Sequence, residues 1–348
     1  MGDASIERMA ARFKKLRREN LEKLFFIIRE VLYPSGQNYQ QFMEDLRESK
    51  FSTGRTCPHC SSTHVIMFGT FKGRQRYRCR NSNCKKTFSD FTHSPLARTH
   101  YPEKWILFAE CMLKNKTLRK TSKEIHIALS TAFYWRHKLL KALQKLELVP
   151  FEGITEADET FFLFSEKGRR NIKNITGRDP RHRGGVASKR GLSHEQVCVM
   201  VAFDRDKDRT VSKVACTGMI SKESIDRVIG PFVGDNTVLC TDANRVYRPY
   251  CRDKNIQLVQ LKKDQKKHGI YHVQNVNSYH SQLKTWVRVF NGVASKYLDG
   301  YLAWFGFRVK KAETAMNAKM KEMIIEACLK GLETTTTCRS IRQSAFAV

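Results

Sequence analysis

The sequence has no hydrophobic run that approaches the roughly 20 residues of a membrane span, although 41% of its residues are hydrophobic. It has no apolar signal segment in its first residues and no internal repeat. It is also poor in acidic residues, with 34 Asp and Glu among 348 residues. These absences argue against a membrane protein, an exported protein and a repeat architecture. We expect a cytoplasmic globular protein of two or three domains.

Basic residues are abundant instead, because 63 Lys and Arg give a formal net charge of +29. Such an excess makes the folded chain repel itself unless a polyanion neutralises it. Nucleic acid is the partner that this charge favours, and no isolated basic amphipathic helix points to a membrane surface. The 11 cysteines are an odd number, and seven stand singly in apolar segments. This pattern is typical of a reducing compartment rather than of a disulfide framework.

Four cysteines lie in two short motifs, C-x2-C and C-x4-C: Cys57, Cys60, Cys79 and Cys84. Thiolates at these spacings can close tetrahedrally on one zinc ion. Strand-like runs at residues 65–68 and 76–78, separated by Lys72-Gly73, predict a zinc ribbon between the two motifs. A module this small would depend on the metal to fold. Unrelated free or buried cysteines are the alternative, and His59 or His64 could replace a sulfur ligand.

The region around this module is strongly basic. Residues 51–150 contain 19 Lys and Arg against five Asp and Glu. We therefore expect the ribbon to contact nucleic acid, with a merely solvated basic surface as the alternative. The ribbon side chains that we assign to this contact are Arg74, Arg76, Arg78, Lys85 and Lys86.

Residues 118–125 and 131–143 have the proportions of a helix-turn-helix, with Ser130 as the cap of the second helix. We expect that helix to pack through Phe133, Leu140 and Leu143. Its polar and basic side chains would then face outward: Tyr134, Arg136, His137, Lys138 and Lys141. Recognition helices use such faces in the major groove, so Arg136 and Lys138 are predicted DNA contacts. A plain helical hairpin is the alternative.

The chain is helical in its first 50 residues, and its texture changes to short strands after Gly153. Three strands, the first two far apart in sequence and the last two joined by a hairpin, precede alternating helices and strands. This is the element order of a ribonuclease-H-like fold. The predicted elements are helices at 6–31 and 39–46, strands at 154–164, 196–203 and 210–216, a helix at 221–228 capped by Ser221, a strand at 237–241, a helix at 244–251, a strand at 256–261, helices at 276–290 and 312–332, and a frayed tail from 334.

Three oxygen-bearing side chains stand where such a sheet could bring them together. Asp158 lies in the first predicted strand, Asp242 directly follows the strand at 237–241, and Asn277 opens the helix at 276–290. Lys284 falls on the same helical face as Asn277. Magnesium-dependent phosphodiester chemistry needs hard oxygen ligands from separate elements. Taken singly, each of these residues could equally be an ordinary polar residue at the end of a strand or helix.

Several sequence blocks resemble bacterial insertion-sequence transposases of the ISXO-like group, between about residues 55 and 310. The blocks are Cys57-Pro-His-Cys60, Tyr77-Arg-Cys79 to Phe88-Ser89, Phe133-Tyr-Trp-Arg-His137, Glu156-Ala-Asp-Glu-Thr160, Thr241-Asp-Ala243 with Tyr247, His272-Val-Gln-Asn-Val-Asn277 with Lys284, and Ser295-Lys-Tyr-Leu-Asp-Gly-Tyr301. Two features depart from the group's pattern. Related enzymes have Glu where this chain has Asn277, so one magnesium would bind less tightly unless Glu159 or a DNA phosphate compensates. The second cysteine motif is longer than the usual C-x2-C.

The resemblance implies a multidomain α/β protein whose catalytic domain is ribonuclease-H-like with a mixed sheet. Its parts would be an N-terminal helical region at 1–50, a four-cysteine zinc ribbon at 51–95, a helix-turn-helix-like DNA-binding region at 96–150, the catalytic domain at 151–311, and a C-terminal helix and tail at 312–348. Asp158, Asp242 and Asn277 would be the catalytic triad that holds two Mg²⁺, for which Mn²⁺ can substitute, with Lys284 beside it. The four ribbon cysteines would hold one structural Zn²⁺.

The implied activity is that of a DNA transposase. It would bind the terminal inverted repeats of its own element, cleave phosphodiester bonds and transfer the 3′-OH ends to target DNA. Because two ends must be brought together, we expect a homodimer or higher oligomer, associated with a bacterial nucleoid. A basic loop at residues 167–190, with nine Lys and Arg against one Asp, would order on DNA, unless it is only solvated. Its assigned DNA contacts are Arg169, Arg170, Arg181, Arg183, Lys189 and Arg190.

Two other functions fit the same residues. A non-catalytic DNA-binding regulator could use a nuclease-like domain only to dimerise, which the neutral Asn277 favours. A structure-selective nuclease could cut branched DNA without joining its ends. The ribbon and the helix-turn-helix candidate favour recognition of specific ends over this second possibility.

Overall fold

The computed structural model describes residues 11–13, 16–17, 20–21, 35–146, 150–169, 179, 185–188, 191–262, 265, 267–309, 316–332, 338–343 and 346. The chain divides into two compact units. Unit 1 comprises residues 1–92 and 96–108, and unit 2 comprises residues 93–95 and 109–348. Most of the helix predicted at 6–31 lies outside the described residues. The division into five segments remains a prediction.

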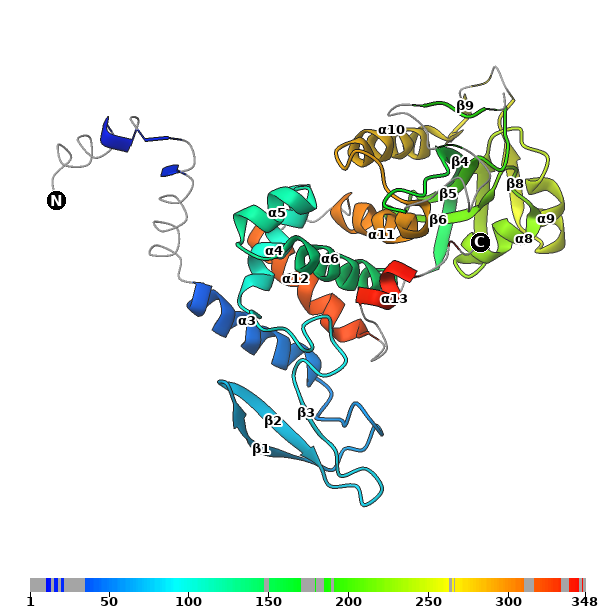
Figure 1. The fold of residues 1–348 in the computed structure, drawn as a ribbon. Helices are drawn as coiled ribbons and strands as arrows, with labels where there is room; N and C mark the ends of the chain where they lie inside the picture. Colours follow the sequence, from blue (N-terminus) through cyan, green and yellow to red (C-terminus); the bar gives the residue numbers. More distant parts are fainter. Residues whose placement is uncertain are drawn as a thin grey trace. The chain divides into compact units, whose positions relative to one another are not determined.

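Unit 1 contains a helix and a small antiparallel sheet of order β1-β2-β3 (Figure 1). The elements are α3 (Ser35–Lys50), β1 (Val65–Phe71), β2 (Arg74–Cys79) and β3 (Thr87–Ser89). Lys72 and Gly73 both have positive φ, of 50° and 73°. Two such residues in succession match the twist of a two-residue hairpin, so the predicted strand pair is confirmed at this turn. The three-residue β3 is too short to show a pattern of its own.

An aromatic ring fills the centre of unit 1. Tyr77 is fully buried and lies against Phe51 and Phe88, with ring centroids 5.2 and 5.3 Å away. The carboxylate of Asp90, also buried, accepts a hydrogen bond from Arg47 of α3 at 3.2 Å. This contact joins the helix to the sheet, but the apolar cluster around Tyr77 is small. So small a core needs another source of stability.

Unit 2 is built on a five-stranded mixed sheet of order β6-β5-β4-β7-β8. Its strands are β4 (Phe151–Leu163), β5 (Gln196–Asp204), β6 (Arg209–Thr217), β7 (Val233–Thr241) and β8 (Gln257–Gln260). β4, β5 and β6 are antiparallel neighbours, whereas β7 runs parallel to β4 and β8 parallel to β7. All five strands lie where the sequence predicted them, and this mixed sheet is consistent with a ribonuclease-H-like core.

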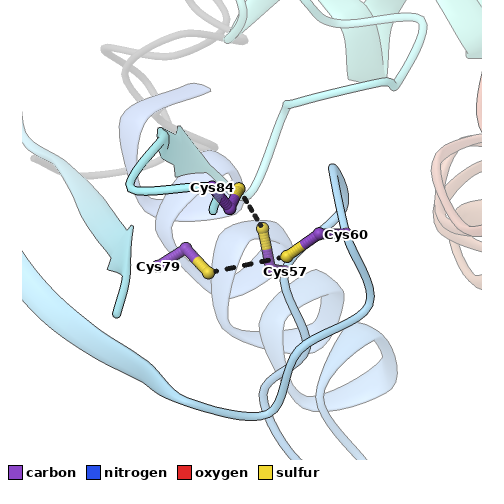
Figure 2. A group of neighbouring side chains, drawn as sticks. All are labelled: Cys57, Cys60, Cys79 and Cys84. Carbon is purple, nitrogen blue, oxygen red and sulfur yellow. Dashed lines mark hydrogen bonds between the residues drawn. The ribbon is translucent and has the colours of Figure 1, made fainter. Parts of the chain in front are cut away.

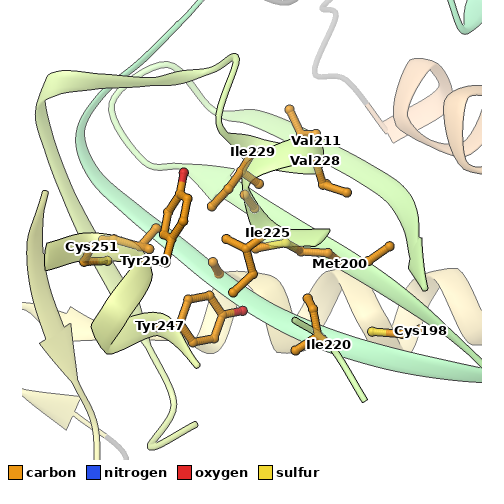
Figure 3. Close-up of a cluster of buried hydrophobic side chains, with 14 of the residues drawn as sticks. Cys198, Met200, Val211, Ile220, Ile225, Val228, Ile229, Tyr247, Tyr250 and Cys251 are labelled. Atoms are coloured by element: carbon orange, nitrogen blue, oxygen red, sulfur yellow. The ribbon is translucent and has the colours of Figure 1, made fainter. Parts of the chain in front are cut away.

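Helices cover both faces of the sheet (Figure 1). One face carries α8 (Lys222–Ile229) and α9 (Tyr247–Asp253), and the other carries α10 (Gln274–Arg288) and α11 (Leu298–Val309). On β5, alternate residues such as Cys198 and Met200 enter the apolar cluster beneath α8 and α9 (Figure 3). Their neighbours in sequence face α10 and α11, because side chains alternate along a strand. The predicted cap of α8 is confirmed, since Ser221 Oγ accepts from the Ser224 N–H at 3.3 Å.

The predicted helix pair is present as α5 (Leu118–Glu124) and α6 (Leu129–Leu143), but its orientation corrects the sequence analysis. Arg136, His137 and Lys138, expected to face outward, are 1%, 5% and 5% exposed. α6 packs against α11 and α12 (Met316–Lys330), which enclose it. Ser130 is inside the helix, whose cap residue is Ala128, without a side-chain hydrogen bond.

Two of these buried cations are held by partners within unit 2. The Arg136 guanidinium donates to the Lys116 carbonyl at 2.7 Å and lies over the ring of Trp304 at 5.2 Å. Lys138 Nζ donates to the Pro95 carbonyl at 2.7 Å. Cations held in this way within the core cannot reach a DNA groove. The assignment of Arg136 and Lys138 as DNA contacts is therefore wrong for this conformation.

Some elements were not expected from the sequence. They are the helix α11, the helix α13 (Cys338–Gln343), and the short strands β9 (Lys267–His268) and β10 (Tyr271–His272). α11 is apolar around most of its circumference and lacks the alternation that marks a surface helix. α13 stands where a frayed tail was expected, and its Ile341 is 1% exposed. The remaining elements are α4 (Lys104–Leu113) and the 3-10 turn η1 (Ser295–Tyr297).

No helix in the part of the chain that the structure describes has the length and apolar character needed to cross a membrane.

The burial of His137 predicts a pH-dependent stability. Its ring lies 4.4 Å from the Phe133 ring and 4.2 Å from the Tyr297 ring, centroid to centroid. Burial, followed by the charge of Arg136, lowers its pKa to about 3. The unfolded chain takes up a proton below its ordinary pKa of about 6.5, so this stability is present above that pH and lost below it. We expect the residue to cost about 1.4 kcal/mol of unfolding free energy between about pH 7.5 and about pH 5.5.

Denaturant unfolding of the wild type and of His137→Phe at both pH values measures this effect. The variant should lose about 1.4 kcal/mol less than the wild type. His194 is exposed, so His194→Gln should behave as the wild type does. An equal loss in His137→Phe and the wild type would contradict the assignment of the effect to His137.

Candidate functional site

The four ribbon cysteines converge in unit 1 (Figure 2). Their Sγ atoms all lie within 4.8 Å of one another. Cys57 Sγ is 3.8 Å from Cys84 Sγ, and Cys60 Sγ is 3.6 Å from Cys79 Sγ. Four sulfurs about 2.3 Å from a central zinc would form a tetrahedron with edges of about 3.8 Å. The cluster therefore fits zinc, and it contains neither His59 nor His64.

Tight turns position these thiols. The Ser61 N–H donates to the Cys57 carbonyl at 2.8 Å, and the Cys84 N–H donates to the Asn81 carbonyl at 3.0 Å. The second motif is longer, but the Asn81 side chain accepts from the Asn83 N–H at 2.9 Å and closes a side-chain turn inside it. The two extra residues are thus absorbed within the loop, so Cys84 still reaches the other three cysteines.

Asp158 and Asp242 are neighbours in unit 2 because of the strand register. Ala157 of β4 pairs with Thr241 of the parallel strand β7, so the next residue of each chain segment is an aspartate. Asp158 pairs with Val201 on its other side, which places it on the face that carries α10. Asp242 is exposed just beyond β7. Gln260 of β8 fixes its backbone by donating to the Asp242 carbonyl at 3.1 Å.

The electrostatics show that these carboxylates lack a counter-charge. Burial raises the pKa of Asp158 to about 7, and the nearby charges of Glu159 and Asp242 raise it further, against a lowering by Lys284. Burial also raises the pKa of Glu159. Carboxylates that repel one another in this way are ready ligands for a cation, which would hold both in their charged form. The donor set therefore suits a divalent metal ion.

α10 presents a histidine and a lysine to Asp158. His280 Nδ1 lies 3.8 Å from Asp158 Oδ2, and Lys284 is close enough to lower the pKa of Asp158. Burial lowers the pKa of His280 to about 4, so the ring is neutral near pH 7. Asn277 is exposed one helical turn before His280, and among the described residues its side chain has no hydrogen bond to Asp158 or Asp242. The structure thus brings Asp158, Asp242 and Lys284 together, with His280 closer than Asn277.

This acidic group is looser than the cysteine cluster. Among the described His, Cys, Asp and Glu residues, no second group of three meets the 4.8 Å limit for mutual ligand-atom distance. Glu159, expected as a possible substitute ligand, belongs to the opposite face of the sheet. There it accepts hydrogen bonds from the Tyr247 hydroxyl and, at 3.4 Å, from the Asn244 amide. Its carboxylate is held by α9 and its preceding loop, and it faces away from α10.

The sequence analysis missed a buried carboxylate that holds α10 in place. Glu156 is fully buried two residues before Asp158 and accepts from the backbone N–H groups of Asn275 and Val276 at 2.9 and 3.2 Å. Arg205 Nε donates to the same carboxylate at 2.7 Å. Glu156 therefore binds the first turn of α10, where a negative charge also meets the positive end of the helix. A single buried Glu in a strand carries no sequence signal, whereas His280 could have been found on the stripe with Lys284.

The ribbon arginines that were assigned to DNA lie beside exposed aromatic side chains. Arg76 and Arg78 lie over the Phe68 ring, at 5.7 and 5.4 Å from its centroid. Arg74 lies over the Phe91 ring at 5.3 Å. Phe68 itself is 41% exposed. Lys85 and Lys86, assigned to the same contact, are also exposed.

The basic loop after β4 is described only in part. Arg169 Nη1 donates to Glu166 Oε2 at 2.9 Å, so its charge is locally paired. The other assigned loop contacts lie outside the described residues: Arg170, Arg181, Arg183, Lys189 and Arg190.

Comparisons with known proteins agree with this geometry. The family model described as "ISXO2-like transposase domain" matches residues 150–310, which contain the whole five-stranded sheet. A protein of Halobacterium salinarum, named "Uncharacterized protein in transposable element ISH50", is 27% identical over 277 residues, covering 76% of this chain and 88% of that protein. It comes from an archaeon, so this similarity does not restrict the chain to bacteria.

Among solved structures, a pre-cleavage Mos1 transpososome is similar at 9% identity, covering 65% of this chain and 78% of that chain, with a TM-score of 0.19. A score this low supports no argument about fold or function. The family assignment depends instead on the match over residues 150–310 and on the relative from a transposable element. Over residues 150–310 the chain belongs to the ISXO2-like transposase domain family.

Proposed function

We propose that the protein is a DNA transposase that cleaves the ends of its own insertion sequence and transfers their 3′-OH groups to target DNA. The domain match over residues 150–310 supports the class of enzyme. The observation that carries the proposal is the register of β4 and β7, which sets Asp158 beside Asp242 on the sheet of that domain. A ribonuclease-H-like sheet with two adjacent aspartates at the ends of parallel strands suits metal-dependent phosphodiester chemistry.

Asp158 and Asp242 are the proposed metal ligands, with the Asn277 amide oxygen as the third candidate on α10. The chemistry that divalent cations supply at such a site is polarisation of the attacking oxygen and neutralisation of the leaving one, with Mg²⁺ the first choice for oxygen ligands. Lys284 faces Asp158 closely enough to affect its titration. We assign its ammonium group to a DNA phosphate near the scissile bond, where it would orient the strand.

Unit 1 is the proposed end-binding module. Arg76 and Arg78 beside the exposed Phe68 ring combine positive charge with an aromatic face. Phosphates and bases are the natural partners for such a surface, because cations bind the backbone and rings stack on bases. Arg74, Lys85 and Lys86 extend the same proposal. Because two DNA ends must be synapsed, we also propose that the active form is a homodimer or a higher oligomer.

Removing either aspartate should abolish DNA cleavage. Asp158→Asn and Asp242→Asn keep the side-chain shape but remove the charge that holds a cation, so we expect at least about a 100-fold loss of strand cleavage. The assay is Mg²⁺-dependent nicking and joining of a labelled DNA carrying the element's ends. Asp253→Asn, at an exposed ion pair with Lys222, is the matched control and should cleave normally.

The outcomes of this assay also separate the two rival functions. Normal cleavage by both aspartate variants would refute the proposed site. Cleavage by the wild type without any joining would indicate a nuclease. Binding to the ends with neither reaction would indicate a regulator, the function that the exposed, neutral Asn277 favours.

Zinc should stabilise unit 1 alone. The purified protein should contain one zinc ion per chain, and chelation or Cys79→Ser should unfold the ribbon, because metal binding contributes to its folding free energy. Metal analysis and limited proteolysis measure the two effects. Cys111→Ser, at a buried cysteine outside the cluster, is the matched control and should leave the zinc content unchanged. A ribbon that stays protease-resistant without zinc would contradict the proposal.

Glu156 should be essential to the stability of unit 2. Glu156→Gln replaces an acceptor of several hydrogen bonds, including that from Arg205, inside the protein. We expect a loss of about 2 to 4 kcal/mol of unfolding free energy, since one partner of a buried ion pair is removed. Glu152→Gln on the same strand breaks an exposed ion pair with Lys207 and should cost less than about 1 kcal/mol. Equal losses in the two variants, measured by denaturant unfolding, would show that the network is not a support for α10.

A further inference from the structure

α10 offers the acidic site an imidazole ring rather than an amide. His280 is 7% exposed, and its Nδ1 faces Asp158 Oδ2 at 3.8 Å. That distance is too long for a hydrogen bond. Its other ring nitrogen, Nε2, is buried and has no hydrogen-bond partner among the described residues. A buried polar ring without hydrogen bonds is costly unless something else binds it.

The distance suits two ligands of one cation. Ligand atoms about 2.1 Å from a shared metal ion lie roughly 3 to 4 Å from each other, depending on the angle between the bonds. The separation of His280 Nδ1 from Asp158 Oδ2 falls in this range. Asp242, beside Asp158 in the strand register, offers the next carboxylate.

Asn277 has a different environment. It is exposed in the first turn of α10, one helical turn before His280, and among the described residues its side chain makes no hydrogen bond to the aspartates. Lys284, one turn after His280, is again close to Asp158. The part of α10 that faces Asp158 is therefore the segment from His280 to Lys284.

We propose that His280, with Asp158 and Asp242, is a ligand of the metal ion in this site and takes the place expected for Asn277; this inference rests on the proposed function. An imidazole changes which metal the site prefers. Mg²⁺ favours oxygen ligands in a strict octahedron, whereas Mn²⁺ accepts mixed oxygen and nitrogen ligands more readily. The site should therefore bind Mn²⁺ more tightly than Mg²⁺.

Electron paramagnetic resonance of Mn²⁺ bound to the full-length protein tests this assignment without DNA or catalysis. Titration gives the affinity from the signal of free Mn²⁺, and pulsed spectra detect a ¹⁴N nucleus bound to the metal. We expect ¹⁴N coupling in the wild type, its loss in His280→Gln and His280→Glu, and its retention in Asn277→Ala, the matched control on the same helix. Mn²⁺ affinity should fall at least about 10-fold in His280→Gln and by less in Asn277→Ala.

His280→Glu serves a second purpose, because it offers three carboxylates in place of two and an imidazole. Competition between the two metals should then shift toward Mg²⁺ relative to the wild type. It also keeps the test decisive if His280→Gln folds poorly, a property checked for every variant by circular dichroism.

Failure of this inference is distinguishable from failure of the proposed function. If Mn²⁺ binding depends on Asp158 and Asp242 but the wild type shows no ¹⁴N coupling, or keeps it in both His280 variants, the histidine assignment is overturned and the aspartate site stands. If Asn277→Ala weakens Mn²⁺ binding and His280→Gln does not, Asn277 is the ligand. If Asp158→Asn and Asp242→Asn bind Mn²⁺ as the wild type does, the metal site itself is refuted.

Discussion

The buried carboxylate of Glu156 is the constraint on which the site depends. It receives the backbone N–H groups at the start of α10 and the Arg205 guanidinium, all from a strand position two residues before Asp158. Because alternate residues share a face, the residue that anchors the helix and the residue that faces the site are set by one strand. The position of His280 and Lys284 relative to Asp158 therefore follows from a fixed helix start and the rise of the helix.

The same unit buries a second unusual charge. Arg136 is enclosed among aromatic rings and donates to a backbone carbonyl. Burial lowers its pKa, although an arginine remains charged. From sequence, basic residues in a candidate recognition helix indicate a DNA contact, and periodicity does not reveal that other helices surround them. α11 supplies Trp304 to this arrangement, and α11 was itself not predicted because it is apolar around most of its circumference. One missed helix thus explains why Arg136 was assigned to the surface.

The sheet, by contrast, could be predicted in detail. Its five strands are short apolar runs separated by polar turns, and the positions of Asp158 and Asp242 in those runs were enough to expect them side by side. The cysteine cluster was equally accessible, because its motifs are local and the geometry of zinc fixes the rest. What could not be predicted is which α10 residue faces Asp158. That depends on the helix rotation set by Glu156 and Arg205, residues that are distant in sequence from α10 and make contacts no sequence period records.

The site also has to reconcile two opposite charges. A formal net charge of +29 draws DNA to the chain, but phosphates approaching Asp158 and Asp242 would add negative charge to carboxylates that already repel each other, as the raised pKa of Asp158 shows. Lys284 is one positive charge beside this pair and cannot offset both carboxylates and a phosphate. A divalent cation would remove the conflict, because it binds carboxylate and phosphate oxygens at once. The acidic pair in a basic protein is therefore best understood as a site completed by metal and DNA together.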